Sequence, residues 1–281
     1  MGTLQVHVDV DNFSVYENEF AAPGAAGSGY IYERALPNAL ALFERYGIKA
    51  TFFIVGKELE QDSCKEFCRL ALSRGHELAN HTYRHPTDLH RMTYAEKEYE
   101  IRQCDERLSE TLNKKPVGFR APGYYLDDDI LHLLFKLGYS YDTSVLPGYA
   151  NHLMRLYLGM NGKVELDKAF GRNRYLFASQ NTCFIGSAEH PERLLYEVPI
   201  STVPFLRLPI HSTFIYTLGS PYFSLIKSMS RLFSESIVYL FHAIDFVEEA
   251  PNDFLASQVP TLRLPYPDRL RIAGEILEMF K

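Results

Sequence analysis

The chain has 281 residues, of which 46% are hydrophobic and 23% are charged, and this is the composition of a globular protein with a sizeable core. The formal net charge of −6 argues against a nucleic-acid partner, because domains that bind nucleic acids carry a basic face. The four cysteines form no CxxC pair, so we expect them to be reduced and buried.

Short apolar runs alternate along the chain with longer segments of helical periodicity. We expect strands at 4–10, 50–56, 76–81, 117–122, 139–146, 194–200 and 236–244. We expect helices at 32–46, 63–74, 92–113, 127–138 and about 268–280, the third of which begins with a Thr93–Glu96 capping box. Repeated strand–helix alternation implies a mostly parallel sheet. For a chain of this length it predicts a closed or nearly closed β/α barrel in a single domain over residues 1–281.

One long segment interrupts this alternation. Residues 148–190 are rich in Gly, Asn, Arg and Tyr and show no clear periodicity. A segment of that length is usually functional or loosely ordered. We interpret it as a lid or insertion in which Arg155, Arg172 and Arg174 face a diphosphate of the substrate, because the arginine side chain matches phosphate geometry.

The sequence shows no segment typical of export or membrane insertion. Its first residues contain no basic stretch followed by an apolar run, which predicts a cytoplasmic protein. The aromatic-rich residues 212–241 are interrupted by Pro221, Lys227 and Arg231, which argues against a spanning helix. Contact of this segment with a membrane surface stays an alternative to ordinary core packing. The oligomeric state is not predicted.

Polar side chains occur where the expected strands end. They are Asp9, Asp11, His81, His85, Arg120 and His242. In a β/α barrel the carboxyl ends of the strands meet at one rim, which carries the chemistry. We therefore expect these six side chains to converge there.

Two imidazoles four residues apart can share a metal ion. His81 and His85 have this spacing, although the spacing alone is more typical of a polar loop or a helix start. Asp11 supplies the third ligand, and catalysis needs an open position for water. Two imidazoles and one carboxylate suit zinc, and also iron or cobalt.

Asp9 and His242 are then available for acid–base chemistry. We interpret Asp9 as a general base, with a second metal ligand or a solvated strand end as alternatives, and Arg120 as the cation that holds it ionised. His242 would protonate the leaving group. No GxSxG or GxxxxGK[ST] motif occurs in the sequence, so a nucleophile elbow and a phosphate-binding loop are excluded. Metal-assisted hydrolysis is the interpretation that uses most of the convergent residues.

These residues resemble the polysaccharide deacetylases, the NodB-homology or carbohydrate esterase family 4 group, over about 4–145 and again around 196–246. HVDVDNF resembles the first motif of this family, and ATFFIVG resembles the strand that follows. HELANHTYRHP resembles its H[ST]xxH motif, with Thr82 at the Ser/Thr position. The resemblance implies that Asp9 is the base and that Asp11, His81 and His85 are metal ligands.

Two further motifs extend the resemblance. GFRAPGYY resembles the motif in which an arginine, here Arg120, orients the base, and a backbone N–H, here that of Gly123, binds the oxyanion. The family usually has an aromatic residue directly after the proline, whereas here Gly123 intervenes before Tyr124, so the wall of the groove is expected to differ. YLFH resembles the last motif, with Leu240 lining the acetyl pocket and His242 as acid. The carboxylate that tunes His242 is left open between Asp142, Glu197 and Asp245.

The resemblance implies a distorted (β/α)7-8 barrel and hydrolysis of an N-acetyl group from an amino sugar. The substrate would be a carbohydrate, or a nucleotide-linked or lipid-linked precursor. The cofactor would be a divalent metal, zinc first, with cobalt, iron or nickel as alternatives. The competing hypotheses are a deformylase or another C–N amide hydrolase of the same fold, and a catalytically silent sugar-binding module.

Overall fold

The computed structural model describes residues 3–20, 29–86, 88–149, 177–233 and 236–281. The chain divides into two compact units. The first unit comprises Met1–Phe52, Glu58–Glu77 and Ile210–Lys281, and the second comprises Phe53–Lys57 and Leu78–Pro209. The predicted single domain over residues 1–281 stays a prediction.

Strands and helices alternate along much of the chain. The strands are β1 (Leu4–Val10), β2 (Ala50–Ile54), β3 (Glu77–Asn80), β4 (Gly118–Phe119), β5 (Tyr141–Asp142), β6 (Cys183–Gly186), β7 (Leu194–Glu197) and β8 (Ile237–His242). The helices are α1 (Phe13–Phe20), α2 (Leu36–Arg45), α3 (Asp62–Ser73), α4 (Tyr94–Leu112), α5 (Asp128–Leu137), α7 (Ser212–Met229), α8 (Asp253–Gln258), α9 (Pro260–Arg263) and α10 (Tyr266–Phe280). Short helical turns are η1 (Ile31–Ala35), η2 (Gly56–Glu60), η3 (Leu89–Arg91), η4 (Pro122–Tyr124), η7 (Ser230–Leu232) and η8 (Ala243–Phe246).

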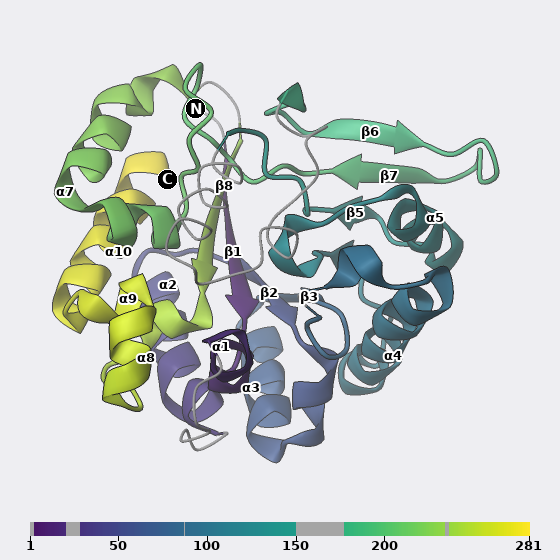
Figure 1. The fold of residues 1–281 in the computed structure, drawn as a ribbon, viewed down its shortest axis with the longest axis horizontal. Helices are drawn as coiled ribbons and strands as arrows, with labels where there is room; N and C mark the ends of the chain where they lie inside the picture. Colours follow the sequence, from purple (N-terminus) through teal and green to yellow (C-terminus); the bar gives the residue numbers. More distant parts are fainter. Residues whose placement is uncertain (1–2, 21–28, 87, 150–176, 234–235) are drawn as a thin grey trace. The chain divides into compact units, whose positions relative to one another are not determined.

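The first unit is built around the parallel pair β1 and β8, which lie side by side in Figure 1. Their register runs from Leu4 opposite Ile237 to Asp9 opposite His242, so the two polar strand ends are neighbours. Both strands are almost continuously buried, as expected for strands in a parallel arrangement covered by helices. Aromatic rings fill the core, where Phe43 contacts Phe52, Phe241 and Phe246.

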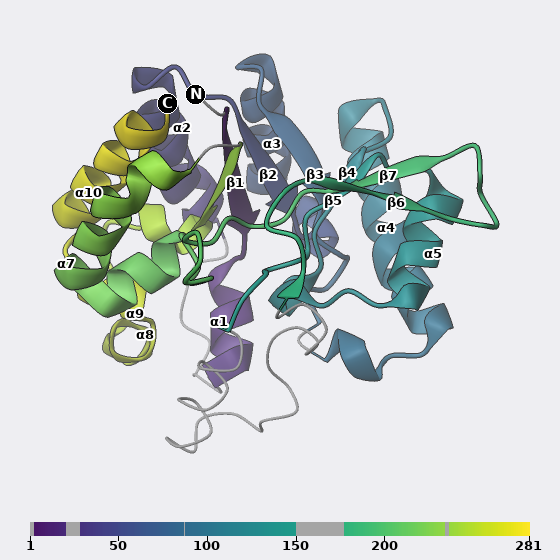
Figure 2. The ribbon, with the colours of Figure 1, turned by 90° about the horizontal axis from the view of Figure 1, so that it is seen from above.

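The second unit contains the strand order β6-β7-β5-β4-β3. The pairs β3–β4, β4–β5 and β5–β7 are parallel, and β6–β7 is an antiparallel hairpin that runs past α5 (Figure 2). Its core is a cluster of apolar side chains from α4, α5 and the neighbouring strands, including Ile101, Phe119, Leu133 and Leu195. This cluster fixes the strands whose carboxyl ends carry the candidate site.

Two helix starts follow directly from the sequence. Thr93 and Glu96 form the predicted capping box at α4, in which the Thr93 hydroxyl accepts from the Glu96 N–H and the Glu96 carboxylate accepts from the Thr93 N–H. Asp127 caps α5 by accepting from the Ile130 N–H. Gly138 ends α5 at a φ of 77°, a conformation that favours glycine.

The strand pairings confirm the predicted α/β class with mostly parallel strands, but several element predictions were wrong. The strands expected at 117–122 and 139–146 are shorter than predicted and consist of β4 and β5 alone. The residues after each strand leave the sheet, because their polar groups form hydrogen bonds that involve side chains. The strand β6 was not predicted, nor were α1, α8 and α9. Cys64, Cys68 and Cys104 are free and buried as expected, whereas Cys183 is free but exposed.

Most of the predicted lid at 148–190 lies outside the described residues, as do Arg155, Arg172 and Arg174. Its described end contains β6. No helix in the described parts of the chain combines the length and apolar character needed to cross a membrane. Contact with a membrane surface stays a prediction.

Candidate active site

Two histidines come together at the end of β3 in the second unit. The ring centroids of His81 and His85 are 4.9 Å apart, and their planes meet at 63°. The His81 side chain is buried and that of His85 is half-buried. The structure therefore brings this predicted pair together on one short loop, with the separation and partial access that a shared ion requires.

A hydrogen bond fixes the protonation of the His81 ring. Its Nδ1 lies 2.8 Å from the carbonyl oxygen of Arg120. A carbonyl oxygen only accepts hydrogen bonds, so Nδ1 carries the proton and the lone pair stays on Nε2. Histidines that bind metals are commonly oriented in this way by a backbone carbonyl.

The loop that carries both histidines has an unusual backbone. Thr82 has a φ of 65° and His85 a φ of 55°, in the left-handed region that β-branched residues such as Thr rarely adopt. The loop is anchored at Asn80, whose Oδ1 accepts from the Thr82 N–H and whose amide donates to the Ile101 carbonyl and to the Tyr139 hydroxyl oxygen. Such strain persists only where surrounding contacts determine the conformation.

Arg120 follows β4 and is completely buried. Its Nε donates to the Thr143 carbonyl at 3.0 Å, its Nη2 donates to the Thr143 hydroxyl at 2.9 Å, and its guanidinium lies 4.2 Å from the centroid of the Phe53 ring. The arginine is therefore held rigidly from two sides. Sequence reasoning did not single out Thr143, although its place directly after β5 was a usable signal.

Gly123 and Tyr124 lie in the turn after Arg120. Both have left-handed backbones, with φ of 62° and 57°, and a Cβ added at Gly123 would meet no atom within 4 Å. The space on the Cβ side of Gly123 is therefore open, although its φ of 62° still favours glycine. The Tyr124 side chain is buried.

The first unit holds the predicted acids at the end of β1. Asp9 and Asp11 are buried, with 3% and 6% of their surface exposed. The next residue, Asn12, donates from Nδ2 to Glu58 Oε2 at 2.7 Å. The same oxygen accepts from the Tyr32 hydroxyl at 3.2 Å and from Gln61 Nε2 at 2.7 Å. This network, which sequence reasoning missed, fixes the chain immediately after Asp11.

His242 ends β8 in the same unit and is paired with Asp245. The His242 side chain accepts from the Asp245 N–H, and the Asp245 carboxylate accepts from the His242 N–H at 2.8 Å. Burial raises the pKa of Asp245, which also accepts from Thr261. Of the three carboxylates left open by the sequence, Asp245 is thus the one that lies in the same unit as His242 and contacts it. Leu240 is fully buried two residues earlier.

Asp142 and Glu197 lie in the second unit, directly opposite each other in the parallel pair β5–β7. Asp142 accepts from the Ser144 N–H at 3.0 Å and from the Ser144 hydroxyl at 2.7 Å, whereas Glu197 accepts from the Val145 N–H at 3.2 Å. Burial, together with the charge of Asp142, raises the pKa of Glu197 well above its ordinary value. Burial raises the pKa of Asp142 as well, so the buried pair disfavours two negative charges.

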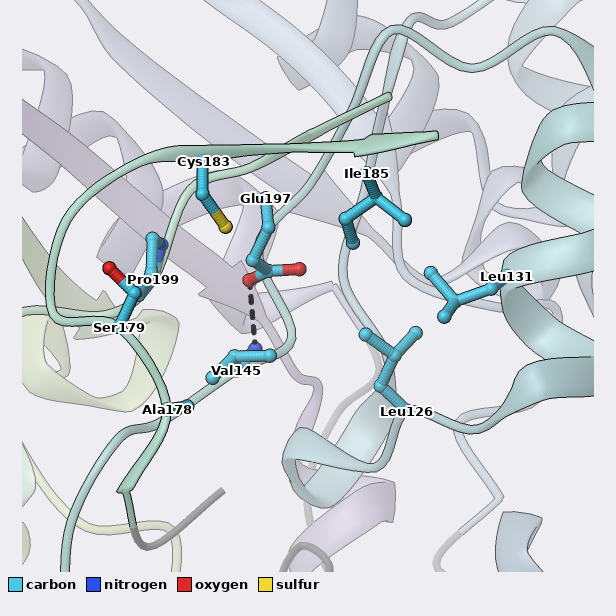
Figure 3. A pocket seen from close by; sticks show the side chains of 9 residues that line it. All are labelled: Leu126, Leu131, Val145, Ala178, Ser179, Cys183, Ile185, Glu197 and Pro199. Carbon is cyan, nitrogen blue, oxygen red and sulfur yellow. Dashed lines mark hydrogen bonds between the residues drawn. The ribbon is translucent and has the colours of Figure 1, made fainter. Parts of the chain in front are cut away.

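Glu197 also lines a small cavity of about 180 Å³ in the second unit. Figure 3 shows its carboxyl group among mostly apolar side chains, with one oxygen bonded to Val145. The walls include Leu126, Leu131 and Ile185. These surroundings explain why the charged form of Glu197 is disfavoured.

An α/β fold with paired histidines at a strand end is typical of metal-dependent hydrolases. Residues 27–141 match the family model described as polysaccharide deacetylase. The chain is 31% identical to a peptidoglycan deacetylase of Helicobacter pylori over 114 residues, which are 41% of this chain and 38% of that protein. These findings confirm the predicted resemblance to polysaccharide deacetylases over residues 27–141. It matches well under half the length of the Helicobacter relative.

Solved structures share the fold over nearly the whole chain. A candidate polysaccharide deacetylase from Mycobacterium smegmatis has a TM-score of 0.63 at 19% identity, covering 99% of this chain and 84% of that one. An allantoinase has a TM-score of 0.59 at 13% identity, covering 98% of this chain and 83% of that one. Similarities at these identities show the fold alone. They confirm the predicted (β/α) fold class, while the chemistry has to be argued from the side chains.

Proposed function

We propose that this chain hydrolyses the N-acetyl group of an amino sugar with the help of a divalent metal ion. The observation that carries the proposal is the His81–His85 pair, in which the His81 proton is fixed on Nδ1 by the Arg120 carbonyl. The polysaccharide deacetylase match over residues 27–141 and the deacetylase name of the Helicobacter relative support an amino-sugar substrate. A carbohydrate, or a nucleotide-linked or lipid-linked precursor, belongs to this substrate class.

We assign Asp11, His81 and His85 as the metal ligands, because the two histidines lie together after β3 and the sequence motif after β1 offers Asp11 as the carboxylate. Two imidazoles and one carboxylate fit a borderline ion, with zinc as first choice and cobalt, iron or nickel as alternatives. A bound divalent ion would act as a Lewis acid toward the amide carbonyl and would lower the pKa of the attacking water.

The other side chains would then handle protons and charge. Asp9 takes a proton from the attacking water, and Arg120 keeps Asp9 oriented and ionised. The Gly123 N–H donates to the oxyanion that forms on the acetyl carbonyl. His242 donates a proton to the amine nitrogen as the C–N bond breaks, so the products are acetate and a free amino sugar. Leu240 and Tyr124 line the space for the acetyl group.

Acetate release tests this proposal directly. Purified protein would be incubated with N-acetylglucosamine oligosaccharides, the nucleotide-linked sugar and the N-formyl analogues, with and without a chelator. We expect chelator-sensitive acetate release with the highest kcat/KM on an N-acetylated sugar. Preference for an N-formyl sugar, measured as formate release, would favour the other C–N amide hydrolases of this fold. Metal binding without any turnover would favour the sugar-binding module.

A further inference from the structure

Thr143 and Ser144, the two residues that follow β5, hold the loop that follows β4. The Thr143 carbonyl and hydroxyl oxygens accept from Arg120, as described above. Its neighbour Ser144 uses its hydroxyl oxygen to accept from the Ala121 N–H at 2.8 Å. Arg120 and Ala121 therefore have their donors fixed by consecutive residues of one turn, and all four residues are buried.

Two carboxyl groups from different strands hold this turn in place. Asp142 binds both the N–H and the hydroxyl of Ser144, so the hydroxyl proton points to Asp142 and a lone pair is left for Ala121. Glu197 binds the N–H of Val145, the next residue in the turn. Asp142 and Glu197 lie opposite each other in the sheet, so the two carboxyl groups hold neighbouring residues of the same turn.

The same set of hydrogen bonds includes His81, a proposed metal ligand. The Arg120 side chain is fixed at Thr143, and its carbonyl oxygen fixes Nδ1 of His81. A displacement of the turn would therefore move Arg120 and change the orientation of the His81 ring. Misplacement by about 1 Å, even when caused far from the reacting atoms, can lower a rate by about 100-fold.

We propose that Glu197 is a positioning residue for the reaction: with Asp142 it fixes the turn Thr143–Val145, which holds Arg120 and Ala121 and, through the Arg120 carbonyl, the His81 ring. This inference rests on the proposed function. Glu197 does not touch the substrate. Its contribution is to supply an acceptor for the Val145 N–H in a place where water is largely excluded.

The chemistry of this role separates conservative from disruptive substitutions. Glu197→Gln keeps a side-chain oxygen that can accept, so the hydrogen bond from the Val145 N–H can persist. Glu197→Leu keeps a similar volume but has no acceptor, so it leaves the buried Val145 N–H without this partner. Leu131→Ala is the matched control, because Leu131 lines the same cavity but takes no part in these hydrogen bonds.

The experiment compares these three full-length variants with the wild type under identical metal loading. We expect Glu197→Gln to keep kcat within about threefold. Glu197→Leu should lower kcat by about 10- to 100-fold with little change in KM, because positioning affects the reacting groups more than substrate binding. Leu131→Ala should lower the melting temperature but leave kcat close to that of the wild type.

Amide hydrogen exchange provides a readout that needs no turnover. The Ala121 N–H lies two hydrogen bonds away from the carboxyl pair, so Glu197→Leu should accelerate its exchange relative to Glu197→Gln and Leu131→Ala at equal global stability. Unchanged Ala121 exchange in Glu197→Leu would overturn the inference, and so would equal losses of kcat in Glu197→Leu and Leu131→Ala. If the wild type released no acetate, the proposed function would fail, and the Ala121 comparison would still decide this inference.

Discussion

The Nδ1 atom of His81 donates to the carbonyl oxygen of Arg120 across 2.8 Å, which joins two strand ends of the second unit through one hydrogen bond. The hydrogen bond defines the tautomer of the His81 ring, because a proton on Nδ1 puts the lone pair on Nε2, the atom that would bind an ion. The orientation of the His81 ring therefore depends on the position of the Arg120 carbonyl group.

Removal of His81 should therefore abolish both metal binding and turnover. We expect His81→Ala to lose most of its bound metal and to lose at least about 2.7–4 kcal/mol of transition-state stabilisation, the cost known for the loss of one oxyanion donor. Elemental analysis of dialysed protein and acetate release measure the two effects. His132→Ala, at a part-exposed position on α5, is the control. Full metal content in His81→Ala would contradict the ligand assignment.

Asp9 should behave differently, since we assign it to proton transfer. Asp9→Asn keeps the size of the side chain but removes its basicity, and loss of a general base typically lowers kcat by about 100- to 10,000-fold. Metal content should stay at the wild-type level, and the exposed Asp88→Asn serves as the control. Loss of metal in Asp9→Asn would instead identify Asp9 as a further ligand.

The sequence predicted those features that depend on local pattern. The β1 strand with its acidic end, the capping box at Thr93 and the four-residue spacing of the histidines are all readable from neighbouring letters, and the structure has the strand and the cap where they were expected. Each is determined by interactions within a few residues. The match to a deacetylase family rests on the same local motifs.

What the sequence did not predict depends on partners that are far apart along the chain. Asp142 and Glu197 were each named as a candidate partner of His242, but only the β5–β7 pairing places them opposite each other. The exposed hairpin strand β6 has a weak pattern because its side chains do not alternate between core and solvent. Asp245 could be chosen as the partner of His242 only from the reciprocal hydrogen bonds at the end of β8.

Glu58 should support Asp11 indirectly. Three buried or half-buried donors converge on its Oε2, and one of them belongs to Asn12, the residue after Asp11. We expect Glu58→Ala to cost about 1–3 kcal/mol of stability per unsatisfied buried donor and to weaken metal binding by about 10- to 100-fold. Metal titration and urea unfolding test this. The exposed Glu66→Ala on α3 is the matched control, and unchanged metal affinity in Glu58→Ala would refute a link to Asp11.

Acid should destabilise the protein in part through His76. This buried residue accepts from the Ala50 N–H at its Nδ1 and packs between the rings of Phe43 and Phe52. Burial, with the nearby charges of Lys49 and Arg74, lowers the pKa of His76 to about 4 from an ordinary value of 6.5. Between those two values the unfolded chain binds the proton and the folded chain does not. The stabilisation is therefore complete above pH 6.5 and is lost as the pH falls toward about 4.

A variant that lacks the His76 imidazole isolates the contribution of this group to the loss of stability in acid. His76→Asn replaces Nδ1 by an amide oxygen that can still accept from Ala50, so we expect its unfolding free energy to fall less between about pH 7 and pH 5 than that of the wild type. Urea unfolding at both pH values measures the difference. His132→Asn should retain the acid sensitivity of the wild type, since that side chain is part-exposed. Parallel pH profiles of His76→Asn and the wild type would show that another group causes the loss, because the proton uptake assigned to His76 would then be absent from the wild-type curve.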